Sequence, residues 1–238
     1  DQHDPNSPSR THAYQMFDRI AHRYDLLNRL LSFGRDVAWR KQIAKNLPQG
    51  QDLKILDLAT GTADVLLALN QQVPHMGNSV GLDMSGGMLH FGHQKIRNRG
   101  LDQKLRLVRG DATCIGLASA QFHATTISFG IRNVINVSQG LEEMHRILQP
   151  GGRALILEFS LPPNKLFRHL YLFYFRHILP LLGGIISGDN SAYKYLNQTV
   201  ETFPYGQEFC DLMIAAGFKN VTPKPLTLGI ATLYVGDK

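Results

Sequence analysis

Residues 54–159 alternate short apolar runs with longer amphipathic runs, and this order restricts the fold more than any other feature. The apolar runs are KILDL, SVGLD, LRLV, ATTISF and RALILEF, and helix-like stretches begin near Asp64, at Ser85 and across Leu141. Strands that alternate with helices are joined by crossover connections, which place the strands parallel. The pattern therefore predicts an α/β fold with a mostly parallel sheet and helices on both faces.

The rest of the chain is predicted to extend this core within a single domain, because 238 residues suit one α/β domain with insertions. The final segment, GIATLYVGDK, is expected to form a closing edge strand. We expect the following divisions of the chain: a polar, disordered tail (1–12), an N-terminal helical cap (13–50), a cofactor-binding core (51–160), an apolar lid or insertion (161–204), and a C-terminal helix with closing strands (205–238).

The stretch KLFRHLYLFYFRHILPLLGGIIS, residues 165–187, is unusually rich in leucine and aromatic residues. Arg168, Arg176 and Pro180 interrupt it, so it does not suit a membrane-spanning helix of about 20 apolar residues. A helix packed on the core is the simplest interpretation. A lid over an apolar ligand, or an element that touches a membrane surface, is the alternative.

Charge and cysteine content limit the setting of the protein. The net charge is +6 with a pI of about 9.4, which permits attraction to anionic surfaces but does not require it. Cys114 and Cys210 lie far apart without metal-ligand spacing, so we expect no metal site and a reducing compartment. Nothing at the start resembles a signal peptide. We expect a cytoplasmic protein. Any membrane contact is expected to be peripheral, at the inner face.

The turn DLATGTAD, residues 57–64, follows the first strand and is the leading candidate for a ligand loop. It has one glycine, Gly61, whereas a dinucleotide loop has three, so an NAD-dependent oxidoreductase is disfavoured. It has no basic residue, and Asp57 and Asp64 stand at its ends. These acids suit a cationic ligand, and S-adenosylmethionine carries an ammonium and a sulfonium group but no phosphate.

Further polar residues follow the other strands, where ligands of open α/β sheets bind. Asp83 ends the second strand, 22 residues after Gly61, where a carboxylate can accept hydrogen bonds from a ribose. A helix cap is the alternative role for Asp83, although Ser85 offers a competing cap. Asp111 and Ala112 follow the third strand and are placed to meet an adenine. In this order, the motifs indicate a class I methyltransferase.

Three longer stretches carry a family resemblance: YDLLNRLLSFGRDVAWR at 24–40, TISFGIRNV at 126–134 and RILQPGGRALILEFS at 146–160. They resemble the signature regions of the ubiquinone/menaquinone biosynthesis C-methyltransferase family. The resemblance implies a Rossmann-like class I fold with a seven-stranded sheet and S-adenosylmethionine as methyl donor. It also implies a prenylated quinol acceptor methylated on a ring carbon, either demethylmenaquinol or 2-methoxy-6-polyprenyl-1,4-benzoquinol, in respiratory quinone biosynthesis.

The resemblance also assigns cofactor contacts, to which we add Asp57 and Gly61 of the turn. The family positions fall on Thr62, Asp83, Asp111, Ala112 and Ser128. Two positions depart from the family pattern. Ala63 stands where the family has glycine and is expected to adopt right-handed helical angles. Asp36 stands where the family has histidine, so a neutral base is not expected there.

Methylation of a quinol carbon requires a group that removes or shares a hydroxyl proton and a group that stabilises the phenolate. Arg132 follows the fourth strand and is expected to point into the cleft and stabilise the oxyanion. A structural ion pair with Glu158 or Asp111 is its alternative role. Asn133 and Tyr24 are further catalytic candidates, the first to orient the acceptor and the second to supply a hydroxyl.

Other functions remain open at this level. A nucleic-acid partner is not expected, because the chain lacks a Pro-Cys nucleophile and an Asn/Asp-Pro-Pro-aromatic run. Another small-molecule C- or O-methyltransferase is an alternative, as is a nonenzymatic protein that binds S-adenosylmethionine or a quinone. The sequence permits an oligomer and does not define its state.

Overall fold

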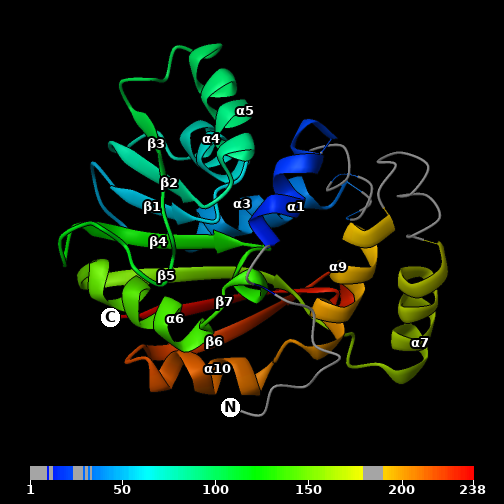
Figure 1. Ribbon diagram of the computed structural model, residues 1–238. Coiled ribbons are helices and arrows are strands. Elements are labelled where there is room, and N and C mark those ends of the chain that lie inside the picture. The colour runs from blue at the N-terminus through cyan, green and yellow to red at the C-terminus, as the bar shows by residue number, and fades with distance from the viewer. Residues whose placement is uncertain (1–9, 11–12, 24–28, 30–31, 33, 179–189) are drawn as a thin grey trace.

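A computed structural model describes residues 10, 13–23, 29, 32, 34–178 and 190–238. Its centre is a seven-stranded sheet with strand order β3-β2-β1-β4-β5-β7-β6 (Figure 1). The first five strands run parallel, and the last two pair antiparallel. The strands are β1 (Ile55–Leu58), β2 (Ser79–Asp83), β3 (Leu105–Arg109), β4 (Phe122–Ser128), β5 (Leu148–Phe159), β6 (Lys219–Leu226) and β7 (Ala231–Asp237). The predicted fold class is confirmed.

The closing strand is not at the edge of the sheet, and that expectation is wrong. β7 lies between β5 and β6, and all but its last residue are buried. The edge strand is β6, most of whose residues are exposed. β6 carries Pro223 and Pro225. Proline cannot donate a ladder hydrogen bond, so these two residues suit an edge position and gave the signal for it.

Helices cover both faces of the sheet, and each face has its own apolar core. One core joins Ile55 and Leu155 of the sheet to helices α1, α3, α4 and α5, and the other joins Leu56 and Ile156 to α6 and α10. Successive strand residues point to opposite faces, which explains why neighbours enter different cores. The helices of these layers are α1 (Ala13–Ile20), α3 (Asp36–Asn46), α4 (Asp64–Gln72), α5 (Gly86–Arg97), α6 (Val137–Ile147) and α10 (Gln207–Ala215).

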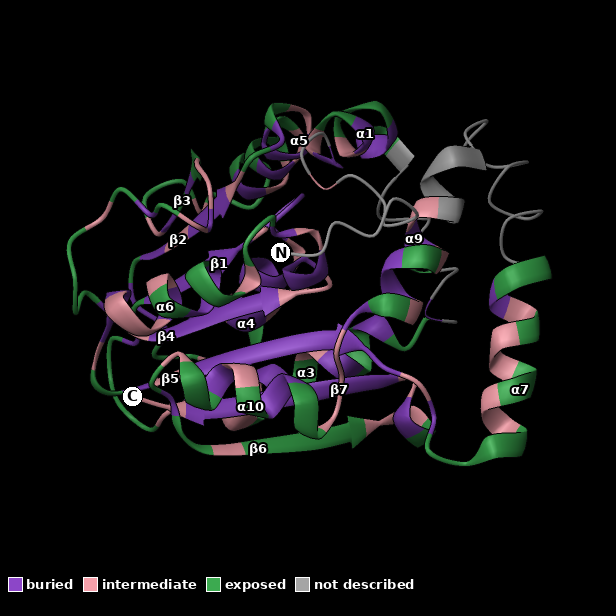
Figure 2. Cartoon of the chain, turned by 60° about the horizontal axis from the view of Figure 1, so that its bottom comes forward, coloured by how far each residue is buried: buried purple, intermediate pink, exposed green. Residues whose placement is uncertain are grey.

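The insertion after β5 contains α7 (Lys165–Phe173), a π-helical turn η3 (Tyr174–Ile178) and α9 (Asn190–Thr202). None of the nine residues of α7 is buried, and the helix stands apart from the sheet layers (Figures 1 and 2). Phe175 of η3 is buried and anchors the segment to the core. Among the described residues, no helix has the length and apolar character needed to cross a membrane. Three short helical turns complete the described part of the fold: η1 (Ala21–Arg23), η2 (Ile131–Asn133) and η4 (Thr227–Gly229).

Candidate active site

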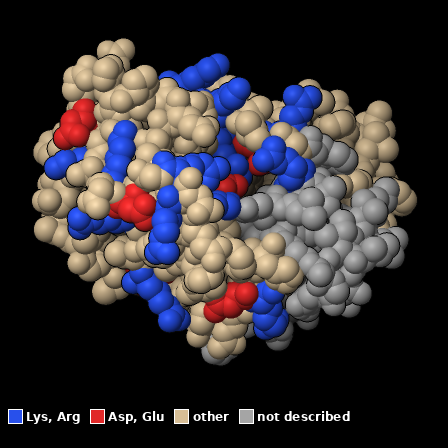
Figure 3. Space-filling model, turned by 90° about the horizontal axis from the view of Figure 1, so that it is seen from above, with Lys and Arg blue, Asp and Glu red and all other residues tan. Residues whose placement is uncertain are grey.

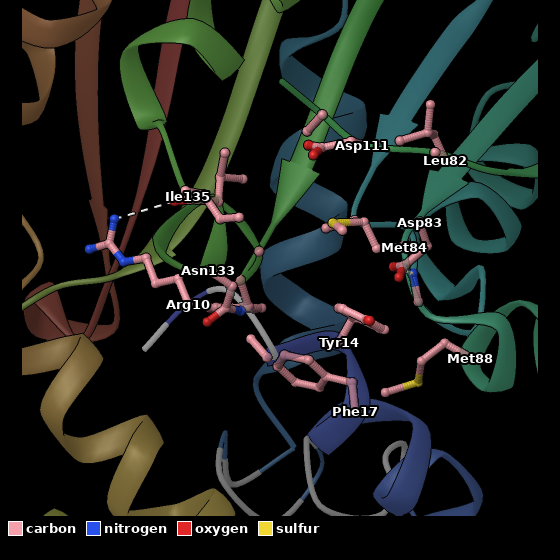
Figure 4. A pocket seen from close by; sticks show the side chains of 18 of the residues that line it. Arg10, Tyr14, Phe17, Leu82, Asp83, Met84, Met88, Asp111, Asn133 and Ile135 are labelled. Atoms are coloured by element: carbon pink, nitrogen blue, oxygen red, sulfur yellow. Dashed lines mark hydrogen bonds between the residues drawn. The ribbon is translucent and has the colours of Figure 1, made fainter. Parts of the chain in front are cut away.

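A pocket lies beyond the carboxyl ends of the central strands, where the sequence placed the ligand (Figure 4). We call it the strand-end pocket. Residues of the turn after β1, of the loops after β2, β3 and β4, and of α1 line it. Six of the predicted residues are among them: Gly61, Asp83, Asp111, Ala112, Ser128 and Asn133. The topology thus brings together side chains that are up to 72 positions apart in the sequence.

Asp83 organises the polar side of the strand-end pocket. Its carboxylate accepts hydrogen bonds from the backbone N–H groups of Gly61 and Ser85, each at 2.8 Å. The Ser85 hydroxyl caps α5 by accepting from the Met88 N–H, so the helix-cap role belongs to Ser85. Burial raises the pKa of Asp83, and the backbone donors oppose that rise. A carboxylate has about four acceptor positions, so the backbone donors leave capacity for a ligand hydroxyl.

The turn after β1 places every second residue in the left-handed region. Ala59, Gly61 and Ala63 have φ angles of 46°, 55° and 65°. The expected right-handed angles at Ala63 are therefore wrong. Left-handed angles cost an alanine roughly 1–2 kcal/mol, and the surrounding structure must hold them. At Gly130 a Cβ atom would overlap the Ala59 side chain, which explains a glycine where the loop after β4 crosses this turn.

Asp57, Thr62 and Asp64 of the turn do not line the strand-end pocket. The expectation that the acids at both ends of the turn face a cationic ligand is therefore wrong. Asp57 is buried beneath the turn and accepts from the hydroxyls of Thr60 and Thr126 at 2.7 and 2.5 Å. Burial raises its pKa to about 7. Asp64 pairs with Lys95 at 2.6 Å, and the Lys95 ammonium also donates to the Thr62 hydroxyl. The loop sequence could not show this cation, which comes from α5.

The departure at Asp36 has a structural explanation. Its side chain is buried, pairs with Arg40 at 3.2 Å and accepts from the Ser32 hydroxyl at 3.0 Å. Arg40 also contacts Asp64 at 3.2 Å. Arg40 thus links α3 to the first residue of α4, and an aspartate at position 36 supplies the carboxylate that this pairing needs.

The catalytic candidates separate in space. Arg132 does not line the strand-end pocket, so the expectation that it points into that cleft is wrong. Its Nη1 donates to Glu158 Oε1 at 2.6 Å and to the Phe129 carbonyl at 2.8 Å, which matches the alternative of an ion pair. Asn133 does line the pocket and accepts from the Tyr195 hydroxyl at 3.0 Å. Tyr24 lies outside the described residues.

Comparison with known proteins defines the family. The model of the "ubiE/COQ5 methyltransferase family" matches residues 7–238. The chain belongs to this family. It is 47% identical over 94% of its length to the ubiquinone/menaquinone biosynthesis C-methyltransferase UbiE of Geotalea daltonii, covering 95% of that protein. It is 44% identical to the demethylmenaquinone methyltransferase of Thermus thermophilus, over 94% of this chain and 100% of the relative.

A solved structure also supports the fold of this family member. It is a SAM-dependent methyltransferase from Thermotoga maritima, described as a possible histamine N-methyltransferase. It superposes with a TM-score of 0.67 over 94% of this chain and 99% of its own, at 17% identity. Identity this low supports the class I fold alone.

Sequence motifs missed the part of the strand-end pocket that comes from the N-terminus. Tyr14 and Phe17 of α1 line it, and so does Arg10, which donates to the Val134 carbonyl at 3.3 Å (Figure 4). Asp18 fixes α1 by accepting from the Gly87 N–H at 2.8 Å. The sequence offered only the amphipathic pattern of α1 as a signal. Apolar residues of β2, of α5 and of the connecting loops were missed as well: Leu82, Met84, Met88 and Ile135.

The strand-end pocket fits S-adenosylmethionine by the chemistry of its lining. Asp83 offers acceptors for a ribose diol, and Leu82 and Met84 offer apolar surface beside it for an adenine. The buried Ser128 hydroxyl has no hydrogen-bond partner among the described residues and is free for a ligand. The turn contributes no cation that would select a phosphate.

Proposed function

We propose that this chain is an S-adenosylmethionine-dependent C-methyltransferase that methylates a ring carbon of a prenylated quinol in respiratory quinone biosynthesis. The strand-end pocket is the observation that carries this proposal, because it is built around the Asp83 carboxylate rather than a phosphate site. The names of the relatives at 44–47% identity support the acceptor class.

Within this proposal, side chains of the strand-end pocket hold the donor and position the acceptor. Asp83 binds the ribose hydroxyls, Asp111 and Ala112 border the adenine, and Ser128 and Gly61 contact the remainder. The bound donor supplies an electrophilic methyl group. Asn133, fixed by Tyr195, orients the acceptor. Holding both molecules in reactive geometry supplies most of the rate.

The surface of the insertion supports a peripheral membrane contact. Leu166, Leu170 and Phe173 of α7 are exposed, and Leu228 of η4 is 72% exposed beside them. Leu166, Leu170 and Leu228 line an apolar groove between α7 and the end of β6. A polyprenyl tail is insoluble in water, so its enzyme gains from an apolar surface that meets the bilayer. Arg176 pairs with Glu201 at 2.8 Å. The carboxylate partly compensates the Arg176 charge, which weakens its attraction to anionic lipid head groups.

The charge distribution favours this proposal over a nucleic-acid partner. Lys and Arg side chains are scattered over the face in Figure 3, with Asp and Glu among them. A nucleic-acid binding surface gathers basic side chains in a continuous patch or stripe. From the exposed apolar groove beside α7, we further propose a cytoplasmic protein at the inner face of the membrane. An oligomer is compatible with this proposal.

A label-transfer assay tests the proposal. The protein is incubated with methyl-labelled S-adenosylmethionine and, in separate arms, demethylmenaquinol and 2-methoxy-6-polyprenyl-1,4-benzoquinol in vesicles. We expect label in at least one quinol and a strong loss of donor affinity in Asp83→Ala, measured by calorimetry. Donor binding without label in either arm would support a nonenzymatic binding protein, and label in an unrelated acceptor would support another small-molecule methyltransferase.

A further inference from the structure

Three buried polar atoms between the core and the insertion have no hydrogen-bond partner within the described part of the chain. They are Nε of Arg132 on η2, Oε2 of Glu158 on β5, and Oη of Tyr171 on α7. An unsatisfied buried polar group costs roughly 1–3 kcal/mol, and native proteins contain few of them. Three such atoms from three elements therefore point to a ligand that satisfies them together.

The contacts around these atoms place them in one cluster. Arg132 and Glu158 are joined at 2.6 Å, and the Arg132 guanidinium lies 5.5 Å over the ring of Phe159, the residue after Glu158. Phe159 packs on Phe175, and Tyr171 stacks on Phe175 with ring centroids 5.3 Å apart. The charges of Arg132 and Glu158 both act on the Tyr171 hydroxyl.

The three atoms have complementary hydrogen-bonding roles. Nε of Arg132 can only donate, Oε2 of an ionised Glu158 can only accept, and a tyrosine hydroxyl can do either. A ring hydroxyl can donate to Oε2 of Glu158 and accept from both Nε of Arg132 and the Tyr171 hydroxyl, since a hydroxyl has one donor and two acceptor positions. Building on the proposed function, we propose that these atoms bind a hydroxyl of the acceptor ring and that Glu158 is the base that takes its proton.

The proton transfer keeps the charge of the site constant. The O–H bond breaks, the proton moves to Oε2 of Glu158, and the electron pair stays on the ring oxygen. Negative charge moves from one oxygen to another, and both lie beside the Arg132 guanidinium. Burial raises the pKa of Glu158, which makes its carboxylate a stronger base than an exposed one.

The cluster adjoins the strand-end pocket through the short helix η2. Arg132 and Asn133 are consecutive on this three-residue helix, and only Asn133 lines the pocket. A ring between the two side chains would have its hydroxyl at the cluster and its carbon toward the methyl donor. Access depends on α7, which has no fully buried residue and is held at this point by the stack of Tyr171 on Phe175.

Tyr171→Phe tests the site because it removes only the hydroxyl, and Tyr174→Phe on the same segment is the matched control. We expect Tyr171→Phe to lower kcat/KM for the prenylated quinol about tenfold, as for a lost hydrogen bond to a charged group. Affinity for S-adenosylhomocysteine should be unchanged, and the thermal midpoint of the free protein should rise because an unpaired hydroxyl is gone. Tyr174→Phe should stay within about twofold of the wild type, because the Tyr174 hydroxyl is not one of the three atoms of the cluster.

Glu158→Gln and a binding measurement complete the test. Glu158→Gln keeps the side-chain size and should lower turnover at least about 100-fold, the usual contribution of a general base. A tail-free naphthoquinol should raise the thermal midpoint of the wild type, and the same concentration should raise that of Tyr171→Phe by clearly less. Unchanged quinol kinetics and an unchanged midpoint shift in Tyr171→Phe would refute the site. A midpoint shift without methyl transfer in the wild type would keep the quinol site and refute the proposed function.

Discussion

The turn after β1 and the insertion around α7 serve the two halves of one proposed reaction, and they are built in opposite ways. At the turn, the carboxylates of Asp57, which is buried, and of Asp83, which ends β2, each accept hydrogen bonds from two protein groups. In the insertion, α7 has no buried residue, and Tyr171 holds its hydroxyl without a partner in the described structure. We call the turn and Asp83 the donor half of the site, and the insertion with Arg132 and Glu158 the acceptor half. In the proposed reaction, protein hydrogen bonds preorganise the donor half, whereas the ligand completes the acceptor half.

Arg132→Ala should give the largest loss of stability, because it leaves Glu158 buried without its cation. Removal of one partner from a buried pair costs about 3–5 kcal/mol. Arg153→Ala is the control, since its pair with Asp237 at 2.7 Å also involves β5 but is about a third exposed. That loss should stay below about 1 kcal/mol. Urea denaturation measures both, and equal losses would contradict the burial argument.

Asp57→Asn should remove the contribution of Asp57 to the pH dependence of the free energy of unfolding. The pKa of Asp57 is about 7 in the folded protein, whereas an unfolded aspartate titrates near pH 4. Between these values only the folded state binds the proton, so this group lowers stability as pH rises, and its penalty is complete above pH 7. The stability of Asp57→Asn relative to wild type should rise by roughly 2–3 kcal/mol from pH 5 to pH 7. A constant difference would mean that Asp57 ionises at its usual pH.

Substitutions of Ala63 test the left-handed conformation of the turn, and we expect an intermediate effect on the free energy of unfolding. Its φ of 65° and its complete burial make a β-branched residue unfavourable, so Ala63→Val should cost more than about 2 kcal/mol. In Ala63→Gly, relief of about 1 kcal/mol of strain is offset by a lost buried methyl of about 0.8 kcal/mol. That variant should stay within about 1 kcal/mol of wild type. Thermal denaturation separates the two variants, and a tolerated valine would contradict the left-handed conformation.

The sequence predicted the donor half well because strand order and strand ends define it. Asp83 and Gly61 were found from their spacing after consecutive strands, and the structure joins them at 2.8 Å. The roles of Asp57 and Asp64 were missed, because partners that fix them come from other elements: Thr126 of β4 for Asp57, in addition to Thr60 of the turn, and residues of α3 and α5 for Asp64. Pairing across elements depends on packing, which local sequence does not encode.

The acceptor half was less predictable for the same physical reason. The leucine- and aromatic-rich composition indicated an apolar element but not which of its faces is exposed. The ion pair of Arg132 with Glu158 was foreseen only as an alternative, since β5 and η2 are joined by tertiary contacts 26 residues apart. The orphan hydroxyl of Tyr171 has no sequence signal at all, because an unsatisfied group is defined by what surrounds it.

Leu170→Ser should have the smallest effect on stability. It should nevertheless weaken vesicle binding without changing donor affinity, which distinguishes the two halves of the site. Leu170 is 58% exposed, so the free energy of unfolding should change by no more than about 0.5 kcal/mol. Binding to anionic vesicles that contain a prenylated quinol should weaken, because apolar surface at the bilayer contact is lost. Donor affinity should be unchanged. Ile214→Ser is the control, because Ile214 is also exposed, at 54%, and lies on α10 rather than on α7. Equal vesicle binding by both variants would remove α7 from the membrane contact and leave the groove without a proposed role.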